Sequence, residues 1–73
     1  MSAPTLDRAA VLAAAIQQMA ARVTDAIGDQ SLASVWHGDD TPQYARATRA
    51  VERRTAALVR LTHALARAGT RAT

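Results

Sequence analysis

The sequence contains no cysteine, no phenylalanine and no lysine, and it has only one tryptophan, one tyrosine and one glutamate. Without cysteine the chain can form neither a disulfide framework nor a thiolate metal site. No apolar run approaches the roughly 20 residues of a membrane-spanning helix. The longest apolar run, residues 9–16, follows no cluster of positive charge. We therefore expect no cleaved signal peptide, and export would need another route.

Large apolar side chains are also scarce. The 73 residues, which we treat as one domain spanning 1–73, include 19 alanines and, Met1 aside, only 16 larger apolar residues. A chain of this size rarely encloses a core that is stable alone. The composition therefore predicts that the chain completes its core on a partner.

Charge is unevenly distributed along the chain. All nine basic residues are arginine, and the net charge is +3. Residues 1–40 carry two arginines and five aspartates, a net of −3, whereas residues 41–73 carry seven arginines and one glutamate, a net of +6. The two halves attract each other if the chain folds back on itself.

A long helix is predicted for residues 5–36. Ser2 or Thr5 can cap its start, and Pro4 suits a first helical turn. Gly28 could break this helix, with Asp29 capping a short new one, but we expect a continuous helix that is weak at Gly28. The larger apolar residues fall on one helical stripe: Leu12, Ile16, Met19, Val23 and Ile27.

A turn at residues 37–41 separates this helix from a second one. Gly38 can adopt a positive φ beyond a helix end, and Thr41 followed by Pro42 is a typical helix start. The second helix is predicted for residues 42–68, ended by Gly69, with residues 69–73 frayed. Its apolar residues have heptad-like spacing, which suits near-parallel packing on another helix: Tyr44, Val51, Leu58 and Leu65, with Ala47, Leu61 and Ala68 alongside.

These elements predict an all-α fold, an antiparallel two-helix hairpin. Two hairpins would pair, as a homodimer or heterodimer, into a four-helix bundle. The apolar stripes of both helices are the predicted partner interface: Leu12, Ile16, Met19, Val23 and Ile27 with Val51, Leu58, Leu61 and Leu65.

A row of arginines lies opposite the apolar stripe of the second helix, and we call it the basic face: Arg46, Arg49, Arg53, Arg60 and Arg67. It is a solvated face, or it meets an acidic protein surface. It could also follow the phosphates of a nucleic acid. That alternative makes the chain a cytosolic nucleic-acid binder of phage or plasmid type. No interleaved aromatic residues are present to stack on bases.

Catalytic and metal-ligating residues are not predicted. Glu52 lies among arginines, which keep a carboxylate ionised rather than ready to act as an acid. His37 is at the bend and His63 is near the other end of a hairpin, so one chain cannot join them at a metal. We expect no enzyme activity and no cofactor.

The bend and its flanks resemble the WXG family, small helical hairpins exported by type VII secretion with Trp-x-Gly at the bend. The matching residues are Trp36-His37-Gly38, and Tyr44 stands where the family often has an aromatic residue. The resemblance covers about residues 30–69. It implies a protein–protein interaction module that is secreted without a cleaved signal peptide, together with a paired chain. We expect Trp36 to cover the open end of the hairpin, with Tyr44 close to it.

The sequence departs from the family in one motif that matters for export. The family's signal, Tyr-x-x-x-Asp/Glu after the second helix, has no match, because the only tyrosine precedes Ala45-Arg46-Ala47-Thr48 and residues 69–73 carry no acid. The chain is also shorter than members of the family. If the chain is exported, its partner supplies the signal; otherwise it is cytoplasmic.

Overall fold

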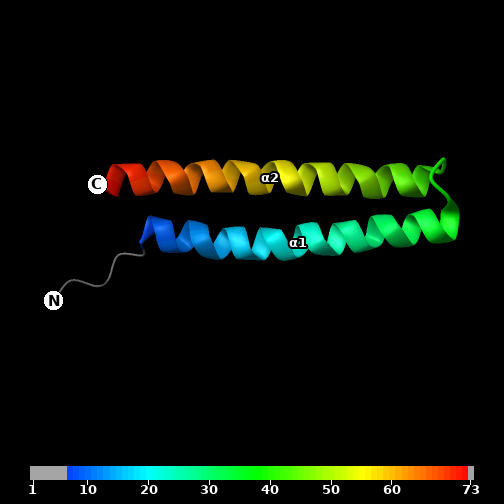
Figure 1. Ribbon diagram of the computed structural model, residues 1–73, viewed down its shortest axis with the longest axis horizontal. Helices are drawn as coiled ribbons and strands as arrows, with labels where there is room; N and C mark the ends of the chain where they lie inside the picture. Colours follow the sequence, from blue (N-terminus) through cyan, green and yellow to red (C-terminus); the bar gives the residue numbers. More distant parts are fainter. Residues whose placement is uncertain (1–6, 73) are drawn as a thin grey trace.

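The protein is a hairpin of two long antiparallel helices. The structure, a computed structural model, describes residues 7–72, with side chains to residue 69. Helix α1 runs over Arg8–His37 and helix α2 over Pro42–Ala72, and no strand occurs in this part of the chain. Figure 1 shows the helices side by side, with the start of α1 and the end of α2 at the same end. The predicted all-α helical hairpin is confirmed.

Helix α1 starts at Arg8, and Asp7 is its N-cap. The Asp7 carboxylate accepts a hydrogen bond of 3.1 Å from the backbone N–H of Ala9, which satisfies one of the free donors at a helix start. The caps predicted at Ser2 and Thr5 lie outside the described residues. At Gly28 the helix is continuous, as expected.

Helix α2 starts at Pro42, as predicted, but it does not end at residue 68. It continues through Gly69 to Ala72, so the predicted end at residue 68 is wrong; fraying of the tail stays a prediction, and Thr73 lies outside the described residues. Glycine costs a helix only about 1 kcal/mol relative to alanine. It ends a helix when it takes a positive φ, and within the described residues Gly38 alone does so.

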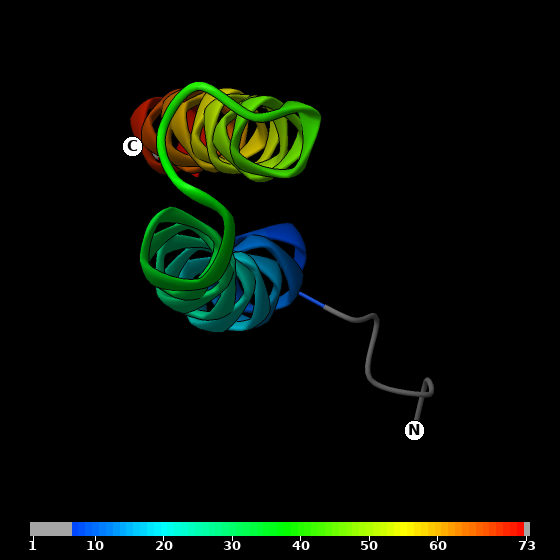
Figure 2. The ribbon, with the colours of Figure 1, turned by 90° about the vertical axis from the view of Figure 1, so that its right-hand side faces the viewer.

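The hairpin is a single layer with almost no closed interior. Figure 2 shows α1 and α2 lying beside each other when the molecule is viewed from the bend, and no other element covers them within the described residues. The radius of gyration is 16.9 Å, whereas a compact domain of this length has about 11 Å. Ala26, at 1% exposure, is the only buried hydrophobic residue in the described part of the chain. The apolar side chains between the helices are therefore only half covered by the fold.

Side-chain hydrogen bonds cross between the helices at two places in the part of the chain that the structure describes. Gln30 donates to the hydroxyl of Thr48, and Arg54 donates from Nη1 to the backbone carbonyl of Arg22 at 3.4 Å. These bonds join positions 30 with 48 and 22 with 54, which sets the antiparallel register. Arg54 interrupts the row of apolar residues on α2. Its guanidinium is accommodated there because it donates to the backbone carbonyl of Arg22.

Candidate protein-interaction site

The bend is built by Gly38 and Thr41. Gly38 has φ 89° and ψ 159°, a conformation that is essentially restricted to glycine. Its N–H donates to the carbonyl of Ser34 at 3.0 Å. The Thr41 hydroxyl donates to the carbonyl of Gly38 at 2.8 Å and accepts from the N–H of Tyr44 at 3.3 Å. The predicted roles of Gly38 in the turn and of Thr41 as the cap of α2 are confirmed.

Trp36 does not cover the end of the hairpin, and this prediction is wrong. Its side chain is 75% exposed. The reason is helix phase: Ala33 and Ser34 are half-buried toward α2, and Trp36 follows two to three residues later, which turns it by about 200–300°. Trp36 is therefore exposed at the end of α1, and its indole ring does not stabilise the bend by burial.

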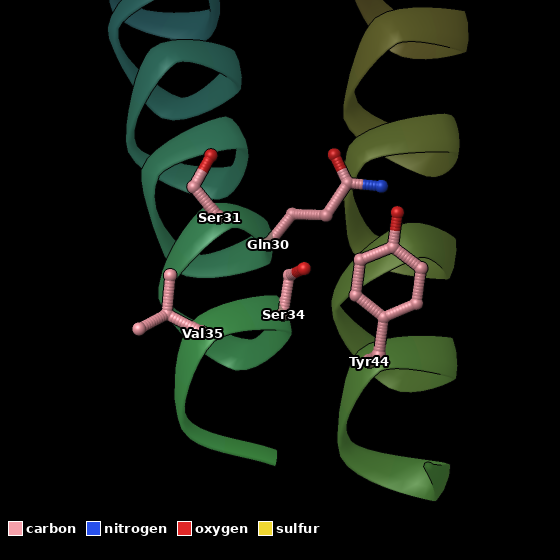
Figure 3. Close-up of a pocket in the computed structure, with 5 residues that line it drawn as sticks. All are labelled: Gln30, Ser31, Ser34, Val35 and Tyr44. Carbon is pink, nitrogen blue, oxygen red and sulfur yellow. The ribbon is translucent and has the colours of Figure 1, made fainter. Parts of the chain in front are cut away.

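Tyr44 is half-buried. The residues of α1 that line a hollow with it do not include Trp36. This hollow is open, lies at the bend end of the hairpin and is lined by Gln30, Ser31, Ser34, Val35 and Tyr44. Figure 3 shows Gln30 and Ser34 reaching from α1 toward α2, with Val35 on the far side of α1. Ligand pockets are usually enclosed and apolar, and this hollow is neither, so we do not treat it as a ligand site.

The predicted apolar stripes lie between the helices with one exception. The half-buried members are Leu12, Ile16, Met19 and Val23 on α1 and Tyr44, Val51, Leu58, Leu61 and Leu65 on α2. Ile27, by contrast, is 48% exposed, and the alanine before it is the buried residue. A row that continues at 3.6 residues per turn from Val23 reaches Ala26 and then Gln30 and Ala33. Ile27 therefore falls to one side of the contact between α1 and α2.

The residues that line that side of the hairpin are all uncharged, and we call it the uncharged face. It consists of two rows at helical spacing, one on each helix: Ala13, Ile16, Ala20, Val23, Ile27, Gln30 and Ser34, and Tyr44, Thr48, Val51, Thr55, Leu58, Thr62 and Leu65. The hydrogen bond between Gln30 and Thr48 links the two rows. Sequence spacing alone missed this face because it depends on how the helices are rotated against each other.

Four of the six polar side chains in the two rows of the uncharged face, all but Tyr44 and Thr55, make a side-chain hydrogen bond. The Gln30 amide and the Thr48 hydroxyl are bonded to each other. The Thr62 hydroxyl donates to the carbonyl of Leu58 at 2.8 Å, and the Ser34 hydroxyl donates to Asp39. Polar groups that already have partners cost little to bury. This face can therefore be covered by another protein surface with a small desolvation penalty.

The arginines of the basic face are all exposed, and they lie on α2 away from α1. The opposite broad side of the hairpin, which includes Arg22, Asp29 and Arg53, is charged. The two broad sides of one thin layer thus differ in charge, and only one of them suits an apolar contact.

Elsewhere in the described residues, no three histidine or acidic side chains gather in a way that could hold a metal ion. Neither described helix is long and apolar enough to span a membrane.

Comparison of the chain with protein families, with curated proteins and with solved structures gives no significant match. The resemblance of the bend to the WXG family therefore stays a prediction carried by Trp36, Gly38 and Tyr44.

Proposed function

We propose that the chain is a protein–protein interaction module that acts as one of two paired helical hairpins. The observation that supports this proposal is the uncharged face. It presents half-covered apolar residues from both helices, and it lies on a fold whose described part buries a single alanine. A second hairpin laid on this face would give a four-helix bundle with a closed core.

The size of the face suits such a pairing. Two helices side by side, each about 10 Å across and about 45 Å long, present roughly 900 Å². A standard stable interface uses about 800 Å² on each partner. One face of the hairpin is therefore large enough to hold a partner hairpin.

A matched pair of variants tests the proposal. Thr55 is exposed on the uncharged face, and the next residue, Ala56, is exposed outside it. In sedimentation experiments at micromolar concentration we expect the native chain to be a dimer. Thr55→Arg should weaken the dimer at least about tenfold because it places a charge in an apolar contact. Ala56→Arg should leave the dimer intact. A compact, cooperatively unfolding monomer for the native chain would contradict the proposal.

The resemblance of Trp36-His37-Gly38 and Tyr44 to the WXG pattern supports a more specific form of this function. In it, the second hairpin is a different chain, so the pair is a heterodimer, and this partner carries the export signal. The pair leaves the cell by type VII secretion without loss of an N-terminal segment. Recovery of the intact chain outside the cell only when the partner gene is present would support this form. Export of the chain alone would contradict it.

The exposed basic face favours a second candidate function, binding of nucleic acid. Five exposed arginines along one helix can contact phosphates. Titration with non-specific duplex DNA across a salt series distinguishes the two functions. Micromolar affinity that falls steeply with salt would support DNA binding, and no binding at low salt would exclude it.

A further inference from the structure

A second apolar surface lies at the bend end of α1, outside the uncharged face. We call it the Trp36 patch: Leu32, Val35 and Trp36, which are 56%, 80% and 75% exposed. Spacings of three and four residues place these side chains next to each other on a helix. Figure 3 shows Val35 on the side of α1 that faces away from α2. Single exposed apolar residues are ordinary, but a contiguous group that includes the only tryptophan is typical of an interaction site.

The patch has an acidic border. Asp29 is three residues before Leu32 and seven before Trp36, and Asp25 is one turn further back, so both carboxylates lie beside the patch. Both are exposed, and neither takes part in an ion pair in the part of the chain that the structure describes. The α1 segment 23–36 contains no arginine. The patch therefore repels phosphates and acidic lipids and suits a cationic partner surface.

A surface of that kind is present on the chain itself. Arg60 and Arg67 belong to the basic face, and both are exposed in the half of α2 that is farther from the bend. The arginines are seven residues apart, about 10.5 Å along a helix, and so are Asp29 and Trp36. One arginine can thus pair with Asp29 while the next stacks on the indole of Trp36. The methylene stems of both arginines can cover Leu32 and Val35.

We propose that the Trp36 patch of one copy docks on Arg60 and Arg67 of a second copy. The contact joins the bend end of one hairpin to the half of α2 that is farther from the bend in the next, so it is a head-to-tail contact that can repeat along a chain of molecules. It uses neither row of the uncharged face. The proposal is therefore independent of hairpin pairing, and both contacts fit on the same molecule.

Trp36 is the only tryptophan, so its fluorescence reports on the patch directly. In low-salt buffer the emission maximum of the native chain should move to shorter wavelength as protein concentration rises, because the indole leaves water. The shift should disappear at high salt, where exposed charges are screened.

Charge reversal identifies the partner surface. The variant with Asp25→Arg and Asp29→Arg, and the variant with Arg60→Glu and Arg67→Glu, should each need at least about tenfold more protein for the same shift. An equimolar mixture of the two variants should recover the native behaviour. In the mixture, the border of the Trp36 patch on each variant meets residues 60 and 67 of the other variant, which carry the opposite charge. All four positions are exposed, and circular dichroism checks that the helices are retained.

The outcomes distinguish this contact from pairing through the uncharged face. Thr55→Arg should keep the Trp36 shift while losing the hairpin dimer. An emission maximum that does not depend on concentration at low salt would overturn the proposal. A shift that survives in the variant with Arg60→Glu and Arg67→Glu would also overturn it, since the patch would then meet another surface. So would a mixture of the two variants in which the native fluorescence shift does not return.

Discussion

Gln30 on α1 donates a hydrogen bond of 2.9 Å from its Nε2 to the hydroxyl oxygen of Thr48 on α2. Both residues are half-buried in the contact between the helices, two turns or fewer from the bend. A directional bond at this position favours one register, whereas apolar side chains alone would tolerate small slips. The pair therefore specifies how the two helices align.

A double-mutant cycle measures this contribution. Gln30→Ala and Thr48→Ala should each lower the free energy of unfolding, and the coupling between them should be about 0.5–1.5 kcal/mol. Denaturant titration monitored by circular dichroism gives the values. Gln17→Ala and Thr55→Ala, at exposed positions of the same helices, are the matched controls and should show no coupling. Additive effects of the first pair would contradict the role assigned to the bond.

The glycines at the bend and in α1 should respond in opposite ways to alanine. Gly38→Ala should destabilise the hairpin by about 1–3 kcal/mol, because its φ of 89° strains any residue with a Cβ. Gly28→Ala should stabilise it by about 1 kcal/mol, since nothing lies within 4 Å of the added methyl group. Thermal unfolding of both variants provides the comparison. A loss of stability for Gly28→Ala would show that α1 benefits from a break there.

Much of this fold follows from local sequence signals. Gly38, Thr41 and Pro42 mark the bend because their backbone preferences hardly depend on tertiary context, and the heptad spacing of Val51, Leu58 and Leu65 identifies the inner side of α2. The ends of the helices were harder to predict. Asp7 is the N-cap of α1 in the structure, but the sequence pattern did not single it out, and Gly69 adopts no positive φ that would end α2.

The rotation of α1 could not be derived from the pattern of large apolar residues. The stripe from Leu12 to Val23 is correct, but beyond it the contact passes to Ala26, because a small residue lets the helices approach closely. Spacing alone places Ile27 in the interior, because it continues the stripe four residues after Val23, and the bend motif alone places Trp36 there. Trp36 is 13 residues after Val23, which at about 100° per residue turns it by about 220°. Helix geometry therefore places Trp36 on the side of α1 that faces away from α2.

The close approach at Ala26 leads to a prediction about packing. Ala26→Leu should destabilise the hairpin by about 1–3 kcal/mol because the added methyl and methylene groups meet a contact that is already closed, at 1% exposure. Ala21→Leu is the control, since that residue is exposed on the same helix. Chemical denaturation of the two variants should separate them clearly. Equal stability would mean that the helices move apart without cost at this point.

Trp36→Ala should change the free energy of unfolding by less than about 0.5 kcal/mol, as is usual for an exposed position. The ring is 75% exposed, so its removal leaves no cavity in the hairpin. Leu58→Ala, at a half-buried position between the helices, is the comparison and should cost clearly more. Both values should come from denaturant titration at a protein concentration low enough that molecules do not associate. Under these conditions, a loss of about 3 kcal/mol or more for Trp36→Ala would show that the indole is buried within a single hairpin. The Trp36 patch would then be unavailable to a partner.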